Sequence, residues 1–197
     1  MDLKTHILQV LKSNETRRIN FNFLGDDNTT TVQIDYTAFQ RVITEIEAGR
    51  ITFGDPAGLP AGSDGGYRSD GNNFTIRPVM TWSRLFNALI VHESVHAYFD
   101  ILSMRLLGID SEAAGYIAQG YYLRNSGFTR ELPDDLVSVG RRCVDVRATG
   151  HINTRALTEL RSNIENDPRY ASIIFRNPTS SNLFSVSNRK YFQGNGV

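Results

Sequence analysis

Two hydrophobic periods follow each other in the first part of the chain. Over residues 3–11 apolar side chains recur every three or four positions, which predicts a short amphipathic helix ending near Ser13. Apolar and polar residues then alternate over 19–23 and again over 32–36, on either side of a Gly-Asp-Asp-Asn sequence at 25–28 that favours a turn. This part of the chain is therefore expected to form a helix followed by a β-hairpin.

The next segment has helical spacing again and then becomes rich in glycine. Apolar residues over 39–46 predict a helix that stops at Gly49, and residues 50–53 are short and β-like. Residues 54–73 contain six Gly, two Pro and three Asp, which predicts a long loop, either an ordinary surface loop or a flap over a substrate cleft. A strand is expected over Asn73–Arg77.

A long and almost wholly apolar run comes next. It predicts a helix that begins near Thr81 or Ser83, either of which can cap it, and continues to Gly108 with little polar surface. Inside this run stand five residues, His92-Glu93-Ser94-Val95-His96, that match the zinc-binding pattern H-E-x-x-H. A buried helix seldom carries such polar groups on adjacent turns unless a partner offsets their desolvation, and a metal ion is such a partner.

Mixed α and β signals precede this motif, and mostly helical ones follow it. The later helices are expected from Asp110 or Ser111 to about Leu123, from Pro133 to about Thr149 and from Thr154 to about Glu165, before an irregular tail after Asn177. The fold class is therefore predicted to be α+β in a single domain, residues 1–197. About 1–80 would form an α/β N-terminal lobe with a small mixed sheet, and about 81–197 a helical lobe with the metal site.

Composition narrows the classes of partner. Lys plus Arg and Asp plus Glu both number 21, so no general attraction to nucleic acid or to an anionic membrane is expected. The single cysteine, Cys143, excludes an internal disulfide and a cysteine-rich zinc finger, and we expect it to be buried. The start of the chain does not resemble a signal peptide and no apolar run approaches the ~20 residues of a membrane span, so a cytoplasmic location is the default expectation, although a specialised secretion route would leave no such mark. No pattern indicates an oligomeric state.

The chemistry of the motif depends on the third metal ligand. On a helix His92 and His96 lie one turn apart on one face, and Glu93 lies beside any water that the metal holds. A metzincin would continue with Gly and then His or Asp where this chain has Phe99 and Leu102, so that class is excluded. Asp100 lies two turns from His92, too far to share the ion, and is expected to orient a histidine or to cap neighbouring structure.

Glu112 is the better third ligand, because a turn at 108–110 would bring it back alongside the motif in an antiparallel helix. Asp110 is kept as the alternative. Over Thr81–Leu123 the chain resembles the gluzincins, the thermolysin-like branch of the zinc metallopeptidases, whose third ligand is a Glu on a downstream helix. The interval from His96 to Glu112 is shorter than is usual in that branch, which requires a tight helical hairpin.

The resemblance implies a zincin-like fold in which the strand at 73–77 lines the cleft, with Zn²⁺ held by His92, His96 and Glu112. Zinc lowers the pKa of its water toward about 7, and Glu93 then accepts the proton as that water attacks a peptide carbonyl. Tyr116 is the leading candidate to stabilise the tetrahedral intermediate, being one turn from Glu112 on the same face. The other side chains of suitable type are Tyr121, Arg147 and His151.

The sequence therefore predicts a zinc metalloprotease that acts on a peptide or protein substrate. Two alternatives stay open. One is a zincin-like metal-binding or regulatory module without efficient proteolysis, suggested by the short chain length that is left for a substrate-binding lobe. The other is a toxin or effector protease that cuts one particular protein.

Overall fold

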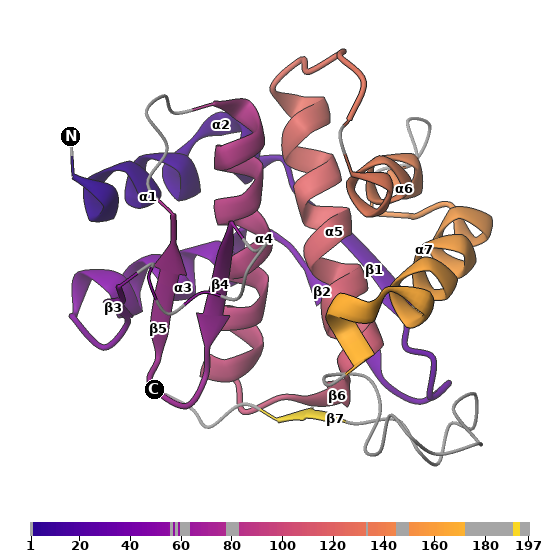
Figure 1. Cartoon of the computed structure of the whole chain (residues 1–197), viewed down its shortest axis with the longest axis horizontal. Coiled ribbons are helices and arrows are strands. Elements are labelled where there is room, and N and C mark those ends of the chain that lie inside the picture. The colour runs from indigo at the N-terminus through magenta and orange to yellow at the C-terminus, as the bar shows by residue number, and fades with distance from the viewer. Residues whose placement is uncertain are drawn as a thin grey trace.

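The computed structural model describes residues 2–55, 57, 59, 64–77, 83–132, 134–144, 150–171 and 191–193. Within these ranges the fold is α+β, with small sheets beside a set of helices (Figure 1). The elements in chain order are α1 (Leu3–Lys12), α2 (Asn14–Arg17), β1 (Phe21–Leu24), β2 (Thr31–Ile34), α3 (Tyr36–Glu47), β3 (Thr52–Phe53), β4 (Gly65–Arg68), β5 (Asn73–Ile76), α4 (Arg84–Ile101), β6 (Arg105–Leu107), α5 (Gly108–Asn125), α6 (Asp135–Cys143), α7 (Thr154–Asn166), the 3-10 helix η2 (Pro168–Tyr170) and β7 (Tyr191–Gln193).

Polar side chains fix where several helices begin. Asp2, Asp35, Ser83 and Asn153 each precede a helix and accept a hydrogen bond from a backbone N–H of its first turn. The helix predicted to begin near Thr81 or Ser83 thus begins after Ser83. Gly49, with a φ of 75°, follows α3 at the position where a helix was expected to stop.

The strands form three small sheets. β1 and β2 make the expected antiparallel hairpin, in which Phe21 lies opposite Ile34. In the second sheet the order is β3-β5-β4, with β3 parallel and β4 antiparallel to the central strand β5. β6 and β7 form an antiparallel pair.

Two sequence predictions about these elements are wrong in part. Residues 54–73 were expected to be a loop, but they include the edge strand β4, which pairs with β5. The long helix was expected to reach Gly108, but α4 ends at Ile101 because Ser103 adopts a φ of 48° and the Met104 N–H bonds to the Phe99 carbonyl. The apolar residues that extended the helical pattern lie instead in β6.

Some predictions fall on residues outside the described ranges. They concern Thr81 as a helix cap, Pro133 as a helix start and most of the tail after Asn177.

Two further predictions are wrong in part. The helix expected to reach about Thr149 ends at Cys143, because Val144 is extended and pairs with Ile152. The tail expected to be irregular includes β7, which pairs with β6.

α4 and α5 lie side by side in the centre of the molecule, as Figure 1 shows, and both are buried on nearly all sides. One hydrophobic core joins the N-terminal helices, the hairpin, the three-stranded sheet and the helices from α4 to α7. Cys143 belongs to this core, as predicted. None of the helices in the described parts of the chain combines the length and apolar character needed to cross a membrane.

A buried ion pair anchors the first turn of α5. Asp110 is 1% exposed, and its Oδ1 accepts hydrogen bonds from Nε and Nη2 of Arg161 on α7, at 3.0 and 2.6 Å. Its Oδ2 accepts from the backbone N–H of Asp26 in the hairpin turn. The same guanidinium donates to the Leu24 carbonyl and lies over the ring of Phe23. This group ties α5, α7 and the hairpin together.

We expect Arg161→Ala to lower the free energy of unfolding by about 3 kcal/mol, because Asp110 would stay buried without its cationic partner. Urea unfolding at neutral pH measures the change. Arg142→Ala is the matched control. Arg142 lies on α6 and pairs with Glu159 of α7 at the exposed surface, where water screens the charges. Equal losses in the two variants would contradict a special role for the buried pair.

Candidate metal centre

Three potential ligands converge at the interface of α4 and α5. His92 and His96 project from α4, and Glu112 projects from the second turn of α5. All three are buried, and one ligand atom from each lies within 4.8 Å of the others. The chain reverses over 102–107, so the antiparallel return predicted from the sequence places Glu112 beside both histidines.

The separations of these donor atoms suit one metal ion. The two Nε2 atoms lie 3.2 Å apart, and each lies 3.5 Å from an oxygen of Glu112. A tetrahedral ion with bonds of about 2.0–2.2 Å has neighbouring donors roughly 3.4 Å apart. The three side chains could therefore bind one ion with little movement.

The remaining nitrogen of each imidazole contacts a side chain of α5. Nδ1 of His92 lies 3.2 Å from Oε1 of Gln119, and Nδ1 of His96 lies 2.9 Å from Oγ of Ser111. Such contacts fix the orientation of each ring. For His92, the amide oxygen of Gln119 can only accept, so this contact favours the tautomer that carries its proton on Nδ1 and leaves the Nε2 lone pair for a metal.

A glycine makes this arrangement possible. A Cβ built on Gly115 would lie 2.7 Å from Nε2 and 2.8 Å from Cε1 of His92, closer than carbon atoms approach in proteins. The imidazole of His92 thus occupies the space that a side chain at position 115 would need. The two helices approach closely here because α5 presents no side chain.

Burial sets the protonation states of the ligand group. It lowers the pKa of His92, and it lowers the pKa of His96 to about 4 although the Glu112 carboxylate acts in the opposite direction. Both imidazoles are therefore neutral at physiological pH, which is the form that binds metal. Burial also raises the pKa of Glu112, while His96 and Arg169 lower it.

Glu93 lies on the same helix, between the two histidines in sequence. Its side chain is buried, and its Oε2 accepts a hydrogen bond of 2.9 Å from the backbone N–H of Tyr67 in β4. Burial raises the pKa of Glu93 to about 7; the Glu112 carboxylate adds to the rise, while His92 and the Tyr67 amide oppose it. A carboxyl group with a pKa in this range can both accept and release a proton near neutral pH.

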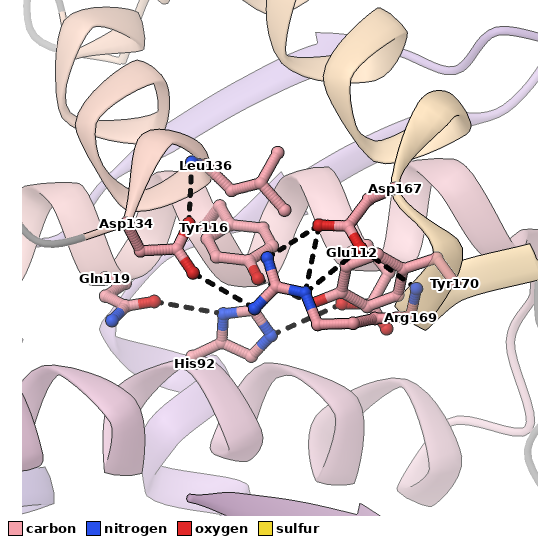
Figure 2. A network of polar contacts seen from close by, with 9 residues as sticks. All are labelled: His92, Glu112, Tyr116, Gln119, Asp134, Leu136, Asp167, Arg169 and Tyr170. Carbon is pink, nitrogen blue, oxygen red and sulfur yellow. Dashed lines mark hydrogen bonds and ion pairs between the residues drawn. The ribbon is translucent and has the colours of Figure 1, made fainter. Parts of the chain in front are cut away.

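Two tyrosines lie beside the ligand group. The ring of Tyr116 meets the imidazole of His92 edge to face, with centroids 4.6 Å apart, and its hydroxyl lies 2.5 Å from the hydroxyl of Tyr170 in η2. Figure 2 shows these rings on the α5 side of His92. Burial raises the pKa of both phenols, so both stay protonated and can donate hydrogen bonds.

Arg169 holds this side of the site together. Its guanidinium donates to Asp134, which caps α6, and to both carboxylate oxygens of Asp167, which caps η2 (Figure 2). The side chain is half exposed, with 51% of its surface accessible, so it lies where the ligand group meets solvent. The bridge fixes η2, and with it Tyr170, against α6.

The other sequence candidates lie elsewhere. Asp110, the alternative third ligand, is engaged by Arg161 as described above and is not part of the ligand group. Asp100 was expected to orient a histidine or to cap neighbouring structure; its Oδ2 accepts from the hydroxyl of Tyr67. Tyr121 stacks on Phe21 in the hairpin. His151 is exposed, and Arg147 falls outside the described residues.

The strand beside the motif also differs from the expected one. Asn73–Arg77 was expected to line the cleft, but β5 is the central strand of its sheet. The edge strand β4 lies between β5 and α4 and supplies the amide that contacts Glu93. Sequence reasoning missed β4 because its glycines resemble those of a loop.

Comparison of the chain with models of protein families, with curated proteins and with solved structures finds no match. The properties of the site therefore rest on its own residues.

We expect Gly115→Ala to weaken metal binding by roughly fivefold to 150-fold, which corresponds to the 1–3 kcal/mol that an overpacked contact costs. Calorimetric titration of the metal-free protein with Zn²⁺ measures the affinity. The control is Gly71→Ala, where the nearest atom to the new Cβ would be 4.0 Å away. Unchanged affinity in Gly115→Ala would show that His92 does not need this space.

Proposed function

We propose that this protein is a zinc-dependent peptidase in which His92, His96 and Glu112 hold the metal and Glu93 is the general base. The observation that carries the proposal is the buried convergence of the three ligand atoms beside a carboxyl group on the same helix. The spacing of His, Glu and His on one helix is typical of hydrolytic zinc sites.

The donor set supports zinc in such a site. Catalytic zinc takes three protein ligands, commonly two histidines and a glutamate, and keeps a fourth position for water or substrate. When bound, zinc lowers the pKa of a water molecule and polarises the carbonyl of the scissile bond. The contacts of Gln119 and Ser111 with the two Nδ1 atoms supply the ring orientation that zinc-binding histidines usually have.

Glu93 would move the proton. The Tyr67 amide donates to Oε2. In the proposed reaction the other oxygen, Oε1, would accept a proton from the attacking water. The same carboxyl group then delivers this proton to the nitrogen of the leaving amine, which completes hydrolysis with Glu93 restored.

The tyrosine pair would stabilise charge on the carbonyl oxygen. Tyr116 and Tyr170 share a hydrogen bond beside His92, and both phenols are protonated at neutral pH. One hydroxyl can donate to the developing oxyanion while the other supports it. The sequence prediction gave Tyr116 as the leading candidate but did not include Tyr170, which the proposal adds.

The resemblance to gluzincins accords with this proposal. The short interval between His96 and Glu112 is spanned by a sharp reversal at Ser103 and the three residues of β6, after which α5 begins at once. The proposed fold is a compact zincin-like arrangement in which β4 is the strand beside the metal-binding helix.

A metal analysis combined with Glu93→Gln tests the activity. Protein purified without added zinc is expected to contain about one zinc ion per chain and to hydrolyse bonds in a broad peptide library. Glu93→Gln should keep the zinc and lose about 10²–10⁴-fold in kcat, the usual contribution of general-base catalysis.

Absence of zinc from the wild-type protein, or iron in its place, would contradict the proposal, since two histidines and a carboxylate also suit Fe(II). Bound zinc without hydrolysis of any library peptide would favour a metal-binding module or a protease restricted to one protein.

The third ligand has its own test. Glu112→Ala is expected to reduce zinc content to a small fraction of the wild-type value, because only two protein ligands would remain. Asp110→Asn should keep its zinc, since Asp110 bonds to Arg161 and lies outside the ligand group. Zinc analysis after dialysis against a weak chelator distinguishes them, and the opposite pattern would assign Asp110 as the ligand.

A further inference from the structure

Tyr67 makes two separate contacts with the helix that carries the metal-binding motif. Its backbone N–H donates to Oε2 of Glu93 at 2.9 Å, and its hydroxyl donates to Oδ2 of Asp100 at 2.7 Å. Glu93 and Asp100 are two turns apart on one face of α4, about 10 Å along the helix axis. Tyr67 therefore contacts α4 through both its backbone amide and the end of its side chain.

The register of the sheet explains why the Tyr67 amide is directed toward α4. The Arg77 N–H bonds to the Asp64 carbonyl, and hydrogen-bonded and non-hydrogen-bonded pairs alternate along an antiparallel ladder. Tyr67 and Phe74 therefore form a non-hydrogen-bonded pair, and the Phe74 carbonyl accepts instead from Gly54. The amide of Tyr67 faces the open edge of the sheet, where Glu93 lies.

The contact with Asp100 is well placed to hold this edge strand. Asp100 is fully buried, and the ring of Tyr67 packs edge-on against Phe74, with centroids 5.3 Å apart. A hydrogen bond between a phenol and a buried carboxylate is among the stronger ones in proteins. It fixes the distance between β4 and α4 one helical turn beyond His96.

We propose that Tyr67 is a positioning residue for Glu93, and that its hydroxyl, anchored on Asp100, holds the β4 amide against one oxygen of the Glu93 carboxylate. Glu93 has a single backbone donor in this contact, so a shift of β4 would release the carboxylate to rotate. With Oε2 held, the carboxylate keeps one orientation, and the direction in which Oε1 can accept a proton is fixed with it. Small displacements of such a group cost much of a catalytic rate.

This inference rests on the proposed role of Glu93, but the contact itself can be tested without any peptidase activity. Hydrogen exchange of the amide at residue 67 is measured by NMR in wild type, Tyr67→Phe, Asp100→Asn and Asp100→Leu. Loss of the anchoring hydrogen bond should speed this exchange about tenfold in Tyr67→Phe and Asp100→Leu. This factor corresponds to the net free energy that such a hydrogen bond contributes to stability. Asp100→Asn keeps an acceptor oxygen and should stay near the wild-type rate.

Tyr98→Phe is the matched control, because Tyr98 is another partly buried tyrosine and lies on α4 itself. Its exchange at residue 67 should equal that of wild type. Thermal unfolding of every variant separates a local change from a general loss of stability, which would speed the exchange of other β4 amides as well.

Kinetics supply the second readout. Tyr67→Phe is expected to lower kcat about tenfold with KM and zinc content unchanged, because a misplaced base affects the chemical step rather than binding. Asp100→Asn should restore most of the wild-type kcat relative to Asp100→Leu.

Unchanged exchange at residue 67 in Tyr67→Phe would overturn the inference, and so would equal loss of kcat in Asp100→Asn and Asp100→Leu. If the wild-type protein hydrolyses no peptide, the proposed function fails, while the exchange experiment still decides whether Tyr67 positions Glu93.

Discussion

The close approach of α4 to α5 is the constraint on which the proposed metal centre depends. Histidine side chains on one helix reach a carboxylate on the next only if nothing stands between them, and at Gly115 the backbone of α5 lies directly against the His92 ring. Neighbouring alanines on α5 are buried and keep the helices close along this stretch. The same packing buries the ligand group, which lowers the pKa of both imidazoles and favours their neutral form. The close packing of α4 against α5 therefore accounts both for the positions of the two histidines and for their neutral form.

Local pattern was sufficient to predict the part of the site that lies on one helix. The spacing of His92, Glu93 and His96 follows from helix geometry alone, and Glu112 followed from the expectation of a short antiparallel return. The hairpin, α1, α3 and α7 were predicted for the same reason, because hydrophobic residues recur at a regular spacing in each of these segments. The α+β class followed from the order of these elements along the chain.

The remaining parts depend on contacts between residues far apart in sequence. Tyr170 meets Tyr116 across 54 positions and Tyr67 meets Asp100 across 33, and neither pairing leaves a periodic signal. β4 is rich in glycine and was therefore hidden in a segment that resembles a loop. The end of α4 was misplaced because the apolar residues after Ser103 are equally suited to a buried strand. Gln119 could have been suggested from its position two turns after Glu112, but many polar residues share such spacing with no role.

The ion pair between Arg161 and Asp110 lies one helical turn or less from Glu112 and makes no use of the ligand atoms. It holds the start of α5 in place by bonds between protein groups alone. The helix that carries the third ligand is therefore secured to α7 and the hairpin whether or not an ion is bound. In this respect the centre differs from a zinc finger, whose fold forms only around its metal. If the proposed metal binds, it enters a site whose framework is already held by contacts between protein groups. Its occupancy would then depend on the concentration of free metal rather than on folding around the ion.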